Sequence, residues 1–169
     1  EIPKRDWSSD VCSSDLDSEH TSYLTAVMLI DHSRVRLQLH PGYEDPKSPE
    51  RFGVADRIPR ADWASLVAAF NGGFKLSDAR GGFYLNGVTA APLRAGAASL
   101  VTYSDGRVDV GEWGRDVTMT EGVESVRQNL RLLVENGKVA PSADAAVKSS
   151  WGGTLSGAYY VWRTGVGVR

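Results

Sequence analysis

Two stretches of the chain carry the signature of tight hairpins: Gly82-Phe-Tyr-Leu-Asn-Gly-Val-Thr-Ala90 and Ser99-Leu-Val-Thr-Tyr-Ser-Asp-Gly-Arg-Val-Asp-Val110. In each, a run of aromatic and β-branched residues is divided by an Asn-Gly or an Asp-Gly pair. Such pairs favour two-residue turns in which both central residues have positive φ. We therefore predict two antiparallel hairpins of the same kind at these positions.

The sequence before these hairpins is also predicted to be mostly β. Residues 21–31 are rich in β-branched and aromatic residues, and residues 35–40 alternate between apolar and polar, so both are predicted strands joined by a turn at Asp31-His-Ser33. Residues 41–59 hold four prolines and predict a surface loop. A short helical turn and a buried strand at Leu66–Phe70 are expected to follow.

The sequence after the hairpins is less decisive. Residues 123–135 are ambiguous, since a helix could run through them while Leu130–Val134 also suits a strand that ends at Asn136-Gly137. Residues 140–150 suit a loop, and residues 159–168 suit a final strand. Many short strands and few helices predict an α+β fold dominated by β structure. We expect a mixed sheet built from hairpins, with a few short helices, that is incomplete at its C-terminus.

Composition limits the classes of protein to consider. The 169 residues are 41% hydrophobic and 24% charged, which suits one globular domain and not a collagen-like, coiled-coil or wholly disordered chain. No apolar run is long enough to span a membrane. A net charge of -2 gives no electrostatic support for binding nucleic acid, so no nucleic-acid partner is predicted.

Neither metal nor cofactor binding is predicted from the cysteine and histidine content. The chain has one cysteine, which excludes a disulfide framework or a site with several cysteine ligands. His20, His32 and His40 have spacings that match no metal-ligand pattern, and exposed surface histidines are the better interpretation. The sequence identifies no cofactor.

The two ends of the chain suggest a division into two segments. Residues 7–16 contain a tandem near-repeat, Trp-Ser-Ser-Asp-Val and Cys-Ser-Ser-Asp-Leu. This is either a polar linker or, as we prefer, a non-native segment, because it resembles the translation of sequencing adapters. We expect residues 1–16 to be non-native and residues 17–169 to form a partial domain, since residues 159–169 stop within a strand pattern.

One candidate site is the segment Asn71-Gly72-Gly73, which follows the predicted strand at Leu66–Phe70. Two glycines let backbone amides approach a ligand closely, and the Asn71 carboxamide can both donate and accept hydrogen bonds. A sugar hydroxyl or a phosphoryl oxygen would suit these groups. A tight turn capped by asparagine explains the same residues without any ligand.

Arg163 is a second candidate. It stands among Val161, Trp162 and Val166, so we expect its side chain to be at least partly buried. A buried guanidinium needs an anionic or bidentate partner. That partner is either a structural carboxylate or a substrate phosphate, and the sequence leaves both open.

An ordered set of motifs covers about residues 20–169. The set comprises Asn71-Gly-Gly-Phe, a Gly-Val after a hairpin, Gln128-Asn-Leu-Arg-Leu-Leu-Val followed by Asn-Gly-Lys, and Arg163-Thr-Gly-Val-Gly. Together they resemble the phosphodiester glycosidase domain family, which includes N-acetylglucosamine-1-phosphodiester α-N-acetylglucosaminidase and bacterial exopolysaccharide-associated proteins. Lys75 departs from the family pattern, which has an aromatic residue there.

The resemblance implies a hydrolase that releases a sugar from a sugar-1-phosphodiester of cell-envelope or exopolysaccharide material. It implies an extracytoplasmic or membrane-anchored location and a carbohydrate phosphodiester as the partner. Arg163 would stabilise the charge of the phosphodiester. The implied catalytic residues are Arg163 and Asp78, and the implied substrate-binding residues are Asn71, Gly72, Gly73, Lys75 and Thr164.

Most glycosidases use a pair of carboxylates, and the family places an aspartate in a strand after the Arg-Thr motif. Within the chain the candidate carboxylates are Asp78, Glu112, Asp116 and Glu121, of which Asp78 lies nearest to the Asn-Gly-Gly turn in sequence. A fragment without its second carboxylate would be inactive. The alternative is therefore a non-catalytic glycan-binding module of the same fold.

Overall fold

A computed structural model describes residues 26–47, 49–141, 143 and 163–169. The segments 1–16 and 140–150 and the strand at 159–168, each predicted above, therefore lie wholly or partly outside the described residues. The chain divides into two compact units, Glu1–Val35 and Arg36–Arg169. All the regular elements among the described residues lie in the second unit.

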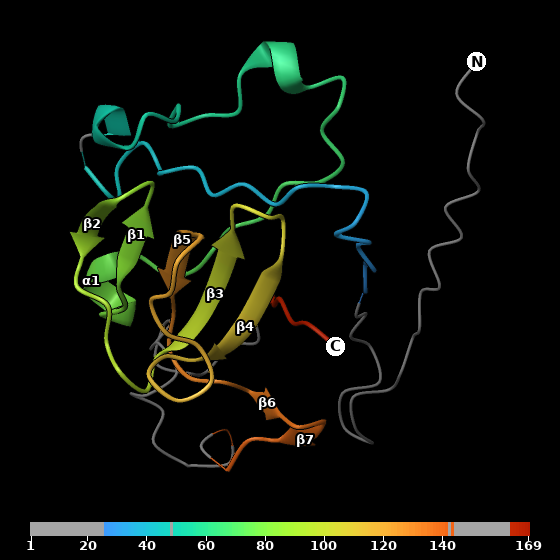
Figure 1. Cartoon of the computed structure of the whole chain (residues 1–169), viewed down its shortest axis with the longest axis vertical. Coiled ribbons are helices and arrows are strands. Elements are labelled where there is room, and N and C mark those ends of the chain that lie inside the picture. The colour runs from blue at the N-terminus through green and yellow to red at the C-terminus, as the bar shows by residue number, and fades with distance from the viewer. Residues whose placement is uncertain (1–25, 48, 142, 144–162) are drawn as a thin grey trace. The chain divides into compact units, whose positions relative to one another are not determined.

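The second unit is built on a five-stranded sheet in the order β2-β1-β5-β3-β4 (Figure 1). Its strands are β1 (Phe83–Leu85), β2 (Val88–Ala91), β3 (Ala98–Tyr103), β4 (Val108–Glu112) and β5 (Val123–Gln128). Every strand pair in this sheet is antiparallel, where we expected a mixed sheet. Antiparallel pairing follows because short turns connect β1 to β2 and β3 to β4.

The remaining elements are short, and the fold is α+β with β structure dominant, as predicted. A second sheet pairs β6 (Val134–Glu135) with β7 (Lys138–Val139). The helical elements are η1 (Pro49–Phe52), η2 (Arg60–Asp62) and α1 (Leu76–Ala79). No helix among the described residues has the length and apolar character that crossing a membrane requires.

Turn chemistry accounts for the hairpins. At Asn86-Gly87 both residues have positive φ, 48° and 84°, as a two-residue turn requires, and Asn136-Gly137 repeats this between β6 and β7. The hairpin at Asp105-Gly106 is present, but its turn is of another kind. There only Gly106 has positive φ, at 89°, and the Tyr103 N–H bonds to the Arg107 carbonyl, so the loop is one residue longer than a two-residue turn.

The sheet packs apolar side chains on both faces. Val126 pairs with Tyr84 on β1 and with Val101 on β3, and both valines are fully buried. The neighbouring positions of β1 point to the opposite face, where Phe83 and Leu85 pack with Phe52. Arg127 is paired with Phe83, so its side chain belongs to this second face.

Three predictions of secondary structure are wrong. Residues 26–31 and 35–40 are not strands, although the turn between them forms, with the Asp31 carbonyl accepting from the Arg34 N–H. Leu66–Phe70 is neither a strand nor buried. A strand requires a hydrogen-bonded partner, and these segments have none among the described residues. Residues 123–128 form strand β5, which excludes the helical alternative there.

Candidate functional site

The Asn71–Phe74 loop contacts the end of strand β5. The Asn71 Oδ1 accepts the Gly73 N–H at 3.0 Å, which closes a local turn. Asn129 Oδ1, just after β5, accepts the Phe74 N–H at 3.4 Å. The loop is therefore fixed both by its own asparagine and by one from the sheet.

Gly73 permits this approach between loop and strand. Its φ is +152°, and a Cβ at this position would lie 3.3 Å from Arg127 Nη2 and 3.4 Å from Asn129 Oδ1. A Cβ on Gly72 would lie 3.6 Å from Arg127 Cγ. Because the loop backbone rests directly on the arginine side chain, glycine is the residue that fits at position 73.

Arg127 is the buried cation of this region, with 9% of its surface exposed. It donates hydrogen bonds to the carbonyl oxygens of Phe74 and Gln128. Burial lowers the pKa of the guanidinium, and the negative charge of Asp45 opposes that shift. Arginine nevertheless stays charged at neutral pH, so a positive charge lies beneath the loop.

Asp45 is the carboxylate tied to the same segment. Its Oδ2 accepts the Leu76 N–H at 2.6 Å, at the start of α1. Its charge acts on Arg127, yet within the described part of the chain no carboxylate forms an ion pair with that guanidinium. Asp45 thus balances the buried charge at longer range while fixing the end of the loop.

Arg163 is exposed, so the prediction that it is at least partly buried is wrong. The described residues 163–169 form no strand, and all seven are exposed. The Arg163 guanidinium carbon nevertheless lies 5.5 Å from the centre of the Phe74 ring, a cation–π contact. The structure therefore brings Arg163 to the loop that contains Asn71, Gly72 and Gly73.

The other predicted site residues do not contact the loop through their side chains among the described residues. Asp78 is exposed on α1 and accepts a hydrogen bond from Ser77 Oγ at 3.1 Å. Lys75 is the exposed residue that precedes α1, and its carbonyl accepts the N–H groups of Asp78 and Ala79. Thr164 is exposed beside Arg163. Asp78 thus lies near the loop in sequence without a bond to it.

Sequence reasoning did not single out Arg127, Asn129 or Asp45. Asn129 appears only as part of a motif, and Asp45 lies in a proline-rich stretch read as a surface loop. The usable signal was Arg127 itself, a charged residue directly before Gln128-Asn129 in a stretch whose secondary structure the sequence leaves open. Its contact with residues 72–74 is long-range, and local sequence patterns do not report such contacts.

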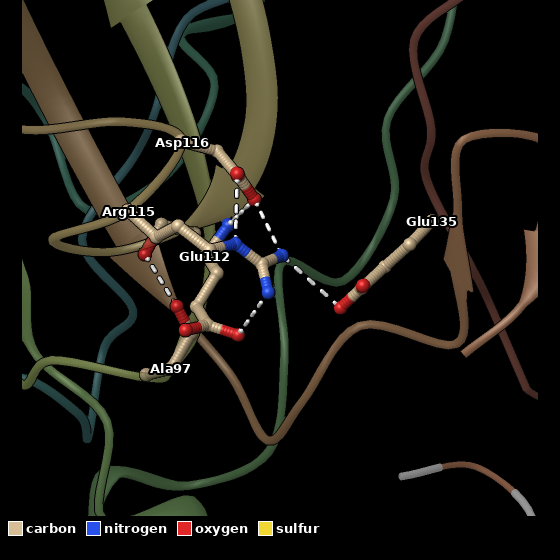
Figure 2. Close-up of polar contacts among 6 residues, drawn as sticks. Ala97, Glu112, Arg115, Asp116 and Glu135 are labelled. Atoms are coloured by element: carbon tan, nitrogen blue, oxygen red, sulfur yellow. Dashed lines mark hydrogen bonds and ion pairs between the residues drawn. The ribbon is translucent and has the colours of Figure 1, made fainter. Parts of the chain in front are cut away.

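A second charged cluster surrounds Arg115 (Figure 2). Its guanidinium lies 3.2 Å from a Glu112 oxygen, 2.9 Å from an Asp116 oxygen and 3.1 Å from a Glu135 oxygen on β6. Hydrogen bonds from Arg115 and from the Glu112 backbone N–H lower the pKa of Asp116 to about 2. Glu112 and Asp116, both candidate carboxylates, are therefore ion-paired partners of Arg115.

No group of three or more His, Cys, Asp or Glu side chains among the described residues is arranged to hold a metal ion. Comparison with family models, with curated proteins and with solved structures gives no match to this chain. The site is therefore interpreted from its own residues and from the motif resemblance.

Proposed function

We propose that the chain is a phosphodiester-glycosidase-type domain that hydrolyses a sugar-1-phosphodiester of cell-envelope or exopolysaccharide material. The proposal rests on the ordered motifs and on one observation of geometry. Arg163, far along the chain, lies over Phe74 next to the Asn71-Gly72-Gly73 turn. Those are the residues to which the motif resemblance gives roles in binding and catalysis.

The reaction requires stabilisation of a leaving phosphate. Hydrolysis breaks the bond between the sugar C1 and the bridging oxygen, water supplies the new hydroxyl at C1, and its remaining proton is released as a phosphomonoester forms. Negative charge therefore grows on the phosphoryl group as the C1–O bond breaks. A guanidinium stabilises that charge through paired, charge-assisted hydrogen bonds, and Arg163 is assigned this role.

The loop supplies groups for the sugar. The Asn71 Oδ1 is engaged by the Gly73 N–H, which leaves the Asn71 amide group free to donate to a hydroxyl without disturbing the turn. Asp78 and Lys75 are exposed beside the loop, and their proposed roles in catalysis and binding stay predictions. A carbohydrate phosphodiester is the partner that this combination of amide and guanidinium suits.

A non-catalytic glycan-binding module is the second candidate. It is favoured by the state of Asp78, whose carboxylate is exposed and paired with Ser77, and by Asp45, whose Oδ2 is bound to the Leu76 N–H. Each carboxylate is already hydrogen-bonded within the chain, and the two do not form the pair of acid and base that most glycosidases use. Binding through Arg163 and Asn71 would need no such pair.

The full chain is tested with a panel of sugar-1-phosphodiesters, measuring free reducing sugar for turnover and calorimetry for binding. Turnover, with kcat/KM lowered about 100-fold or more in Arg163→Ala, is the expected result. Arg60→Ala is the matched control, because Arg60 lies 5.6 Å from the Trp63 ring in a similar contact away from the loop.

Each outcome has a distinct meaning. Binding without turnover, lost in Arg163→Ala and kept in Arg60→Ala, would favour the glycan-binding module. Turnover that Arg163→Ala leaves unchanged would exclude the assigned role of Arg163. Neither binding nor turnover with any member of the panel would contradict both functions.

A further inference from the structure

Two arginines meet at one residue of the candidate site. Arg127 on β5 donates to the Phe74 carbonyl, and Arg163 lies over the Phe74 ring. The two guanidinium groups come from distant parts of the sequence and contact the same residue, one at its backbone carbonyl and the other at its ring. Like charges held near each other are stabilised by an anion that contacts both.

Arg127 retains hydrogen-bonding capacity. Its Nη1 and Nη2 donate to the carbonyls of Gln128 and Phe74, and its Nε makes no hydrogen bond to the described residues. A guanidinium has five N–H groups in a fixed fork, so three donors are left after these two bonds. Nine-tenths of the residue is buried, and its Nη2 lies next to Gly73 of the loop.

The charge of Arg127 is also incompletely balanced. Removing a charged group from water costs several kcal/mol unless a partner compensates it. The described carboxylates form no ion pair with Arg127, and Asp45 acts on it only at longer range while bonded to Leu76. A buried cation that has no carboxylate in direct contact among the described residues is suited to bind an anionic ligand.

At positions 72 and 73, no side chain separates the backbone of the loop from the Arg127 guanidinium. A side chain at position 73 would meet Arg127 Nη2 at 3.3 Å, and one at position 72 would meet the Arg127 stem at 3.6 Å. Because both positions are glycine, no Cβ stands between the exposed loop and the guanidinium. A phosphoryl oxygen that reaches this place would therefore meet backbone and guanidinium groups and no intervening side chain.

We propose that Arg127 is a second anion-binding residue of the site, which binds phosphoryl oxygens beneath the Asn71–Phe74 loop while Arg163 contacts them from the Phe74 ring. The assignment of that anion as a phosphodiester, and as the phosphomonoester product, rests on the proposed function. The ability of Arg127 to bind a phosphate does not require turnover, so the two can be tested apart.

Inorganic phosphate is the probe. The full chain is titrated with phosphate at constant ionic strength set by chloride, following the thermal midpoint and the Nε–Hε signals of the arginines in nitrogen–proton correlation spectra. We expect the Arg127 signal, assigned by its loss in Arg127→Lys, to shift and saturate with the same dissociation constant as the rise in Tm. Chloride alone is expected to move neither.

The variants separate binding from support of the loop. Arg127→Lys keeps the charge but loses the fork, and its affinity for phosphate is expected to fall at least tenfold. Arg131→Lys is the matched control, since Arg131 is exposed four residues along the chain, and its affinity is expected to stay within twofold of the parent. If Arg127→Lys fails to fold, the Arg127 Nε–Hε signal is assigned in the parent chain by its connection to the Arg127 backbone resonances, and its response to phosphate decides the question.

Several results would overturn the inference. Equal phosphate affinity in Arg127→Lys and the parent would do so, as would an Arg127 signal that stays in place at saturating phosphate or an absence of any phosphate binding. Sugar release without an Arg127 response would leave the proposed function intact and remove Arg127 from it. An Arg127 response without sugar release would keep this inference and favour the glycan-binding module.

Discussion

Strand β5 and the segment 61–70 are both rich in residues that suit a buried strand, yet they have opposite fates. Five of the six residues of β5 are buried, whereas every residue from 61 to 70 is exposed. β5 is hydrogen-bonded on both sides, to β1 and to β3, and the segment 61–70 pairs with no described strand. The comparison teaches that partners on both edges, more than apolar content, produced a buried strand in this chain.

The largest effect is expected at the polar end of β5. Gln128 is fully buried, and its Oε1 accepts the N–H groups of Gly82 and Arg94 at 2.9 and 2.7 Å. Its Nε2 donates to the Arg94 carbonyl and to Ser99 Oγ. Gln128→Leu removes all four bonds and leaves the buried Gly82 N–H and the part-buried Arg94 N–H and carbonyl without this partner, so the free energy of unfolding should fall by about 2–5 kcal/mol.

Urea denaturation measures this change, with Gln38→Leu as the control because Gln38 is an exposed glutamine. The control is expected to change the free energy of unfolding by less than about 0.5 kcal/mol. A loss below about 1 kcal/mol in Gln128→Leu would show that water or a rearranged backbone satisfies these groups. The hydrogen bonds at the end of β5 would then add little stability, and the contrast with the segment 61–70 would be smaller.

A matched pair of valines sharpens the comparison directly. Val126 on β5 is 0% exposed and Val67 is 50% exposed. Val126→Ala removes buried methyl groups and leaves a cavity, so a loss of about 2 kcal/mol is expected, against less than about 0.5 kcal/mol for Val67→Ala. Thermal or urea unfolding of both variants provides the check. Equal losses would mean that residues 61–70 are as well packed as the sheet.

The smallest effect is expected at the exposed cluster around Arg115. The pKa of Asp116 is about 2 in the folded chain and about 3.9 in an unfolded one, so its ion pair adds stability above pH 4 that disappears as the pH falls toward 2. Asp116→Asn should therefore be less stable than the parent at pH 6, with the difference closing near pH 2. High salt should reduce the difference at pH 6. A gap independent of pH would assign the effect to packing.

Local turn chemistry explains why the hairpins could be predicted. Asn86-Gly87 has the two positive φ values that its sequence predicts, and this turn fixes the register of β1 against β2. Asp105-Gly106 also predicts its hairpin, but not its turn, because Asp105 keeps an ordinary φ and the loop gains a residue. The Asn-Gly and Asp-Gly pairs therefore predicted the positions of both turns, but the correct turn type only at Asn86-Gly87.

The identity of β5 could not be predicted locally. Val123, Val126 and Leu130 are spaced as on one face of a helix, and the same stretch also suits a strand. Pairing with β1 and β3 decides between them, and that pairing joins residues far apart in sequence. The strands predicted at 35–40 and 66–70 fail for the complementary reason, since no described strand pairs with them.

In the candidate site, too, local features could be predicted from the sequence and long-range contacts could not. Asn71 and its glycines could be found from sequence because the turn is local. The burial expected for Arg163 was wrong, since the described residues 163–169 are exposed and form no strand. Arg127 was missed because its role depends on where the loop backbone lies against the sheet, which only the folded chain defines.

The strand order has a consequence for how the chain acquires its fold. The hairpins β1–β2 and β3–β4 are local and are complete by residue 112, but they do not pair with each other. β5 is the last strand of the sheet to be synthesised and the one that joins them. Contacts of long sequence separation form slowly, so the joining of the hairpins should limit the folding rate. During translation, a chain that ends before residue 123 lacks the strand that joins the hairpins, so the five-stranded sheet can close only after β5 has been synthesised.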